Sequence, residues 1–197
     1  MKKIVLIYCH PYNQSFNHAV FVQLLHNLTR QHITTDVIDL YADHFNPVYD
    51  LEELRLFHDG KTHDPLVTKY LNLLKSADGI IFVTPIWWNE LPSMLKGFID
   101  KVMKEGEGLS HTVTKTGIRG ELTNLKRAYV FTTSASPTFY LQLCCGNAIK
   151  KIFIKVTLKQ LGIKSGIWYN LGGISNAPAA KRQAYLKKCG EMTFDFS

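Results

Sequence analysis

The chain has 197 residues, of which 46% are hydrophobic and 20% charged, a balance typical of one soluble globular domain with an ordinary core. Its four cysteines form no Cys-x-x-Cys pair, so neither a zinc site nor a secreted disulfide scaffold is indicated, and a reducing cytosol fits best. The formal charge of +7 is uneven, with +10 in residues 101–197 and −3 in residues 1–100. The basic residues fall at helical spacing, so solvated helix faces rank first, an anionic ligand second and nucleic acid a distant third.

Apolar runs alternate with helical patterns along the whole chain. The β-branched run 3–9 predicts a strand buried on both faces, and it is too short for a signal peptide or a membrane span. Further strands are predicted over 34–40, 79–84, 127–133 and 165–170. Helices are predicted over 17–31, 65–76, 92–104, 146–161 and 177–189, with Ser15 or Asn17 capping the first and Pro92 at the first position of the third. The least regular segments, 41–64 and 106–124, are where insertions or partner contacts are expected.

This alternation predicts a doubly wound parallel sheet of five strands with helices on both faces, a three-layer α/β/α domain. In such sheets ligands bind beyond the carboxyl ends of the strands, where the strand order reverses. That rule directs attention to three loops, which follow the first, third and fourth strands: 10–17, 85–91 and 134–140.

The first of these loops contains His10, Ser15, Phe16 and Asn17 and leads directly into a helix. A strand that turns through polar residues into a helix directs free N–H groups and the positive helix end at one point, which suits a phosphate. Neither a Gly-x-Gly-x-x-Gly fingerprint nor a P-loop is present. Taken alone, Ser15 and Asn17 are better explained as helix caps than as phosphate ligands.

The other two loops have compositions suited to a flat ring. Trp87 and Trp88 lie between Pro85 and Pro92, which predicts a rigid aromatic wall, although either tryptophan by itself could belong to the core. Small hydroxyl residues after the fourth strand leave backbone N–H groups accessible, and Tyr140 adds a donor, although an ordinary turn explains this loop locally.

The segment 82–102, with Pro-Ile-Trp-Trp followed by Pro-Ser-Met-Leu-Lys-Gly-Phe-Ile-Asp-Lys-Val, resembles the hallmark segment of the flavodoxin-like NAD(P)H:quinone oxidoreductases. Further motifs of that family follow the same order along nearly the whole chain: His10 with Ser15-Phe16-Asn17, Asp39-Leu40-Tyr41-Ala42 with Phe45-Asn46-Pro47, and Thr132-Thr133 with Tyr140. The resemblance therefore implies one flavodoxin-like flavin-binding domain over residues 1–197.

The resemblance also implies an activity and a site. The expected function is ping-pong hydride transfer from NADH or NADPH, through bound FMN or alternatively FAD, to a quinone or a similar flat acceptor. The alternative is a flavin-binding electron-transfer or regulatory subunit of an ion-transport system. The implied flavin-binding residues are His10, Ser15, Phe16, Asn17, Pro85, Ile86, Trp87, Trp88, Thr132, Thr133, Ser134 and Ala135, and Tyr140 is the implied catalytic residue.

Two departures from the family pattern concern the mechanism. Ser134-Ala135 replaces the family's Gly-Gly, so close backbone approach to a ring requires that neither side chain point inward. Cys144-Cys145-Gly146 occupies the place of the family's active-site histidine, so Tyr140 is expected to help and not to be obligatory.

Assembly and location are further expectations. The resemblance implies a cytoplasmic homodimer, with Tyr41, Phe45 and Tyr49 supplying apolar surface at its interface. No metal, nucleic acid or membrane insertion is expected. His58 and His63 are interpreted as exposed loop residues, and adjacent Cys144 and Cys145 as buried small residues.

Overall fold

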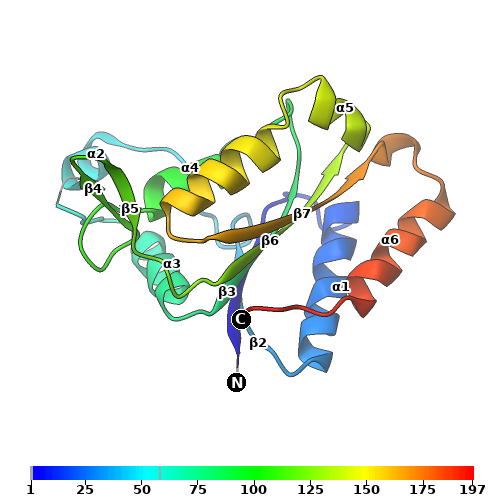
Figure 1. The fold of residues 1–197 in the computed structure, drawn as a ribbon, viewed down its shortest axis with the longest axis horizontal. Coiled ribbons are helices and arrows are strands. Elements are labelled where there is room, and N and C mark those ends of the chain that lie inside the picture. The colour runs from blue at the N-terminus through cyan, green and yellow to red at the C-terminus, as the bar shows by residue number, and fades with distance from the viewer. Residues whose placement is uncertain (1, 58) are drawn as a thin grey trace.

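The most apolar runs of the sequence become the central strands of a parallel sheet in a computed structural model, which describes residues 2–57 and 59–197 (Figure 1). Its strand order is β2-β1-β3-β6-β7. The strands are β1 (Lys3–Tyr8), β2 (Thr34–Asp39), β3 (Gly79–Pro85), β6 (Arg127–Ser134) and β7 (Ser165–Gly172), each ending within two residues of its predicted bounds. The predicted five-stranded, doubly wound α/β fold is confirmed.

Helices cover both faces of this sheet and enclose two separate apolar cores. On one face α1 (Phe16–Arg30) and α6 (Ala179–Glu191) lie side by side (Figure 1) and pack with the chain's C-terminal phenylalanines. The other face is covered by α3 (Pro65–Lys75), α4 (Ser93–Val102) and η1 (Ile149–Leu158). Residues of β1 and β3 alternate between the two cores, which explains their continuous hydrophobicity. Within the described residues, no helix combines the length and apolarity that crossing a membrane requires.

Several local features differ from the predictions. The predicted helix over 146–161 is a π-helix over most of its length, and Pro92 lies at the N-cap of α4, with φ −57° and ψ 150°, instead of the first helical position. Short elements were not predicted: α2 (Leu51–Phe57), the hairpin β4 (His111–Thr114) with β5 (Gly117–Gly120), α5 (Thr138–Leu143) and the 3-10 turn η2 (Ile174–Asn176). Their lengths, three to seven residues, are too short for a period to stand out.

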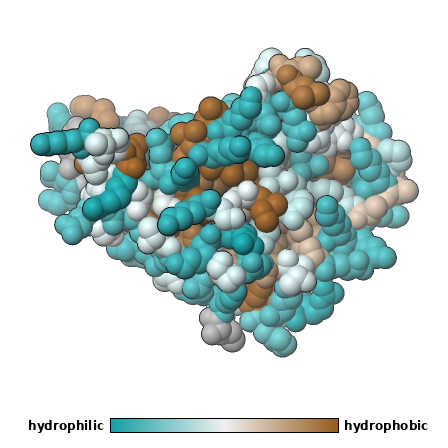
Figure 2. All heavy atoms as spheres, viewed as in Figure 1, coloured by the Kyte–Doolittle hydropathy of each residue, from teal (hydrophilic) through white to brown (hydrophobic). Residues whose placement is uncertain are grey.

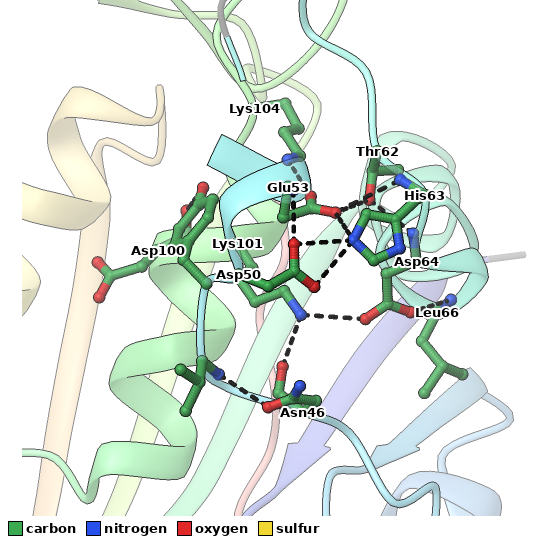
Figure 3. Close-up of polar contacts among 12 residues, drawn as sticks. Asn46, Asp50, Glu53, Thr62, His63, Asp64, Leu66, Asp100, Lys101 and Lys104 are labelled. Carbon is green, nitrogen blue, oxygen red and sulfur yellow. Dashed lines mark hydrogen bonds and ion pairs between the residues drawn. The ribbon is translucent and has the colours of Figure 1, made fainter. Parts of the chain in front are cut away.

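The irregular segment 41–64 is held against α4 by buried charges (Figure 3). The Lys104 ammonium pairs with the Glu53 carboxylate, and both side chains are at most 1% exposed. Lys101 Nζ reaches the Asn46 carbonyl oxygen at 2.7 Å and Asp64 Oδ2 at 3.1 Å. Hydrophobic periodicity does not reveal such ion pairs, so no helix or strand was predicted in this segment.

The buried carboxylate of Glu53 is stabilised in its ionised form. Burial by itself raises its pKa, but hydrogen bonds from Lys104 and from Thr62, the latter at 2.9 Å, outweigh burial and leave the pKa below its ordinary value. Because the folded pKa is the lower one, this contribution to stability is present at neutral pH. It is lost as the pH falls from the unfolded value, about 4.3, through the lowered folded value.

We expect Lys104→Met to lower the free energy of unfolding by about 3 kcal/mol at pH 7, because it removes the ammonium partner of the buried Glu53 carboxylate. The double variant Glu53→Leu with Lys104→Met should recover most of this loss. Urea denaturation measures both. The matched control is Lys96→Met, which removes the exposed ion pair between Lys96 and Asp100 of α4. It should lower the free energy of unfolding by about 1 kcal/mol or less. A Lys104→Met variant as stable as that control would contradict a stabilising role for the buried Glu53–Lys104 ion pair.

Candidate active site

Three loops from different strands meet at one cavity of about 280 Å³ at the carboxyl end of the sheet. The sheet order places β1, β3 and β6 next to one another, so the loops that follow these strands are neighbours in space although they are far apart in sequence. Of the predicted flavin-binding residues, the following line this cavity: His10, Ser15, Phe16, Asn17, Pro85, Ile86, Trp87, Thr133, Ser134 and Ala135.

The loop after β1 brings the N-terminus of α1 to the cavity. Ser15 is the N-cap, and its hydroxyl accepts the His18 amide at 3.1 Å. The first N–H groups of a helix have no partner within the helix, so those of Phe16 and Asn17 are available to an anion. Asn17 is buried, and its Nδ2 donates to Thr133 Oγ1 at 2.8 Å, which joins the first loop to the third.

The loop after β3 is a tight two-residue turn. The Trp87 and Glu90 backbones exchange hydrogen bonds of 3.1 Å and 3.0 Å, and the two residues between them, Trp88 and Asn89, adopt φ of +51° and +67°. Trp87 lies against the His10 ring, with centroids 6.2 Å apart, at the wall of the cavity. Trp88 stands at the tip of the turn, 97% exposed, and does not line the cavity. The backbone conformation, which the residue types do not signal, separates the two tryptophans.

The loop after β6 presents backbone to the cavity. The Ser134 side chain is 3% exposed, and its hydroxyl donates to the Ser136 carbonyl oxygen at 2.7 Å and accepts from Asn170 at 3.0 Å, so it is committed to the protein. Thr132 is buried and does not line the cavity; its hydroxyl accepts from Trp168 Nε1 at 2.7 Å and donates to Asn170 Oδ1 at 2.8 Å.

Tyr140, the predicted catalytic residue, is placed on α5 outside the residues that line the cavity. Its side chain is 45% exposed, and its carbonyl oxygen accepts the amides of Cys144 and Cys145 at 2.8 Å and 3.2 Å. Cys144 is exposed and Cys145 is half-buried, so the interpretation of these adjacent cysteines as buried residues was wrong. The helix ends at Leu143, and Gly146, with φ of +71°, follows the two cysteines.

Two cavity residues, Ile174 and Ser175, were missed from the sequence. They lie on η2, which follows β7, the edge strand, whose loop was left out of the search. The signal that could have found them is the Gly172-Gly173 pair, since a turn with φ of +72° at Gly173 directs the chain back toward the cavity.

His10 lines both this cavity and a second one of about 220 Å³. Its Nδ1 accepts the Tyr12 amide at 3.1 Å, and partial burial lowers the pKa of the ring. The imidazole is therefore neutral near pH 7 and carries its proton on Nε2. Within residues 2–57 and 59–197, no group of three or more histidine, cysteine or acidic side chains could hold a metal ion.

The expectation that His63 is an exposed loop residue is confirmed, since it lies between α2 and α3 with its side chain 47% exposed, and the same expectation for His58 falls outside the described residues. His63 Nε2 lies 3.1 Å from Asp50 Oδ2 and 3.5 Å from Glu53 Oε2 (Figure 3). Its ring is therefore part of the charge cluster that holds segment 41–64, away from the cavity.

A family model described as a flavodoxin-like fold matches residues 2–192. Among curated proteins, the chain is 31% identical over 121 residues to ribosyldihydronicotinamide dehydrogenase [quinone] of Pongo abelii; the match covers 53% of this chain and 52% of that protein. It is 23% identical over 190 residues to an uncharacterized NAD(P)H oxidoreductase of Haemophilus influenzae, covering 96% and 93% of the two chains. The chain thus spans about half the length of the first of these relatives.

Solved structures agree along the whole chain. Smu.1420 from Streptococcus mutans superposes with a TM-score of 0.83 at 32% identity, over 96% of this chain and 97% of that one. An FMN-dependent NADH-azoreductase from Bacillus anthracis, in complex with FMN, superposes with a TM-score of 0.78 at 22% identity, over 97% of each chain, which shows the shared fold. The chain belongs to the flavodoxin-like family that contains the NAD(P)H:quinone oxidoreductases, as its motifs implied.

Proposed function

We propose that this chain is a flavin-dependent oxidoreductase that takes hydride from NADH or NADPH and reduces a quinone or a similar flat acceptor. One observation carries the proposal: three loops line a single cavity at the point where the strand order reverses. The first loop is suited to binding a phosphate, the second supplies an aromatic wall, and the third supplies backbone N–H donors. The names of the relatives and the motif order along the chain point the same way.

The residues present fit FMN. The N-terminal amides of α1, with Ser15 and Asn17, offer the phosphate a positive helix end and hydrogen-bond donors. Pro85, Ile86 and Trp87 form an apolar wall for a ring. Ser134 turns its side chain into the protein, so the Ser134-Ala135 pair keeps its backbone open to the cavity, as Gly-Gly would. FAD is the alternative; FMN is favoured because a structure of the same fold carries it.

The flavin, when bound, supplies the hydride chemistry, and the chain's own groups orient and support it. Backbone N–H groups of the loop after β6 are placed to stabilise negative charge on a ring edge, while the wall formed by Trp87 keeps water from one side of the ring. One open face for donor and acceptor in turn would give ping-pong kinetics. A cytoplasmic location is part of this proposal, supported by four free cysteines.

The purified protein should carry about one flavin per chain and oxidise NADH in the presence of menadione. The absorption spectrum and mass of the bound compound identify FMN or FAD, and steady-state assays with NADH and NADPH measure turnover. A protein that takes up neither flavin contradicts the proposal. Bound flavin with negligible turnover would favour the second candidate, an electron-transfer or regulatory subunit, which the same fold and cavity would serve.

We expect Tyr140→Phe to slow flavin reduction about tenfold while flavin stays bound. The half-exposed phenol is carried by α5, which follows the β6 loop, and a donor at a wet site is worth on the order of 1–2 kcal/mol, against about 2.7–4 kcal/mol in a dry one. Stopped-flow reduction by NADH measures the rate. A loss of a thousandfold or more would make Tyr140 essential, and an unchanged rate would deny it any role; Tyr12→Phe is a control exposed phenol.

The homodimer is likewise a proposal, although its expected interface needs correction. Phe45 is 2% exposed and packs on Tyr70 and Phe98, so it offers no surface to a partner. Figure 2 shows apolar residues gathered over α5 and over the middle of the same face. Exposed apolar side chains there are Phe139, Leu143, Ile152 and Val156. This face replaces Phe45 as the apolar surface that a second copy would cover.

Light scattering at micromolar concentration should therefore give twice the mass of the chain, and Ile152→Glu with Val156→Glu should shift it toward the monomer. Both side chains are about half exposed on η1, so the substitutions leave the core intact. The matched control is Lys155→Glu on the same helix, which adds acidic charge without removing apolar surface. A wild-type monomer that retains activity would refute the dimer.

A further inference from the structure

The second cavity, beyond His10, has a polar lining that the flavin site does not use. It is lined by Tyr8, His10, Pro11, Asn13, His18, Asp39, Tyr41 and Ala42, at the carboxyl ends of β1 and β2. Tyr8 and Asp39 are directly paired in the parallel register of these two strands, so their side chains project from the same face of the sheet. The register, and not a loop, therefore sets a phenol beside a carboxylate.

The Tyr8 hydroxyl lacks a partner although its side chain is buried. Tyr8 is 2% exposed, its ring stacks on Phe21 with centroids 4.6 Å apart, and its hydroxyl makes no hydrogen bond within the described residues. The Ser15 hydroxyl interacts with the phenol from outside hydrogen-bond geometry, and it already accepts the His18 amide as helix cap. Burial raises the pKa of Tyr8, partly offset by Ser15, so the phenol remains a donor near neutral pH. A buried donor without a partner is costly, which indicates a ligand in the cavity.

Asp39 supplies an acceptor to the same space. Its Oδ1 accepts the Tyr41 and Ala42 amides at 3.2 Å and 3.1 Å, and within the described part of the chain no hydrogen bond reaches its Oδ2. The His10 ring carries its proton on Nε2, since Nδ1 accepts the Tyr12 amide. The cavity thus offers phenol and imidazole donors around a carboxylate.

This set of groups selects the kind of ligand. Among the described residues that line the cavity there is no lysine or arginine, and the Asp39 carboxylate would repel a phosphate. A group that both donates to a carboxylate and accepts from a phenol is a hydroxyl, and two adjacent hydroxyls would engage Asp39 and Tyr8 together. A volume of about 220 Å³ accommodates one sugar ring. In dinucleotide-binding sheets, an acidic residue after the second strand binds a ribose hydroxyl in the same way.

We propose that this cavity binds a ribose of the donor dinucleotide, through Asp39 and Tyr8, and so selects NADH over NADPH. The proposal takes the donor's identity from the proposed function, and the shared lining residue His10 places this cavity next to the flavin cavity. The 2′-phosphate of NADPH adds negative charge where Asp39 stands, which disfavours it.

The test measures binding without turnover, by calorimetry on the protein as isolated with FMN in excess. The probes are ADP-ribose and 2′-phospho-ADP-ribose. Wild type should bind ADP-ribose about tenfold more tightly than its 2′-phosphate, and kcat/KM should favour NADH over NADPH by a similar factor. Equal affinities, or no binding of ADP-ribose, would overturn the proposal.

Two variants separate the contributions. Asp39→Asn keeps the Oδ1 acceptor for the Tyr41 and Ala42 amides and removes the charge, so the preference should fall about tenfold. Tyr8→Phe removes a hydroxyl that has no protein partner, so the midpoint of thermal unfolding should not fall while ADP-ribose binds about fivefold more weakly. If both variants bind like wild type, the cavity is not the ribose site.

The carboxylate control is Asp36→Asn, which removes the same charge from β2 at a residue paired with Lys3 at 2.9 Å, outside the cavity. Asp36→Asn should prefer ADP-ribose over its 2′-phosphate as strongly as wild type does. If it loses this preference as Asp39→Asn does, the effect comes from net charge and the proposal is overturned. Failure of the proposed function would look different. A protein that takes up no flavin yet prefers ADP-ribose through Asp39 refutes the reductase and supports the cavity.

Discussion

The parallel register around β1 is the constraint on which the rest of this molecule depends. Because β1 pairs with β2 on one side and β3 on the other, the chain must cross the sheet in opposite directions after its first two strands. The chain connections on the two sides of the loop after β1 therefore run in opposite directions, and both cavities open beside this loop. Helices on both faces bury the central strands, so this arrangement is also the one that encloses the apolar residues.

Few polar contacts then join the loops. Asn17 Nδ2 to Thr133 Oγ1 at 2.8 Å connects the first loop to the third, and the Ile86 amide to the Thr133 carbonyl oxygen at 2.7 Å connects the second to the third. Both bonds converge on Thr133, so the three loops share one anchor at the end of β6. Because these groups are buried, their hydrogen bonds are costly to break, and the site is organised before a ligand arrives.

The same loop after β1 would divide two tasks. Residues from Ser15 onwards face the α1 end of the flavin cavity, whereas His10 stands between the cavities with one ring nitrogen committed to the Tyr12 amide. The proposed role of the Tyr8–Asp39 pair would place donor recognition on rigid strands and leave ring contacts to the loops. Function would thus be shared between a sheet register, which a substitution rarely changes, and loop residues, which can vary.

The sequence by itself determined the sheet, the three strand-end loops and the family. Two signals in the sequence carried this information. Long apolar runs mark the strands clearly, because strands buried on both faces must be apolar, and the family motifs occur in the family's order along the chain. Tertiary structure alone decided the rest. Trp88 stays outside the cavity lining, exposed on a turn with two positive φ values. Thr132 is hydrogen-bonded to Trp168 and does not line the cavity, whereas the Gly172-Gly173 turn brings in Ser175. The Tyr8–Asp39 pair and the Glu53–Lys104 pair each join residues distant in sequence, and neither periodicity nor composition records which buried polar groups will meet.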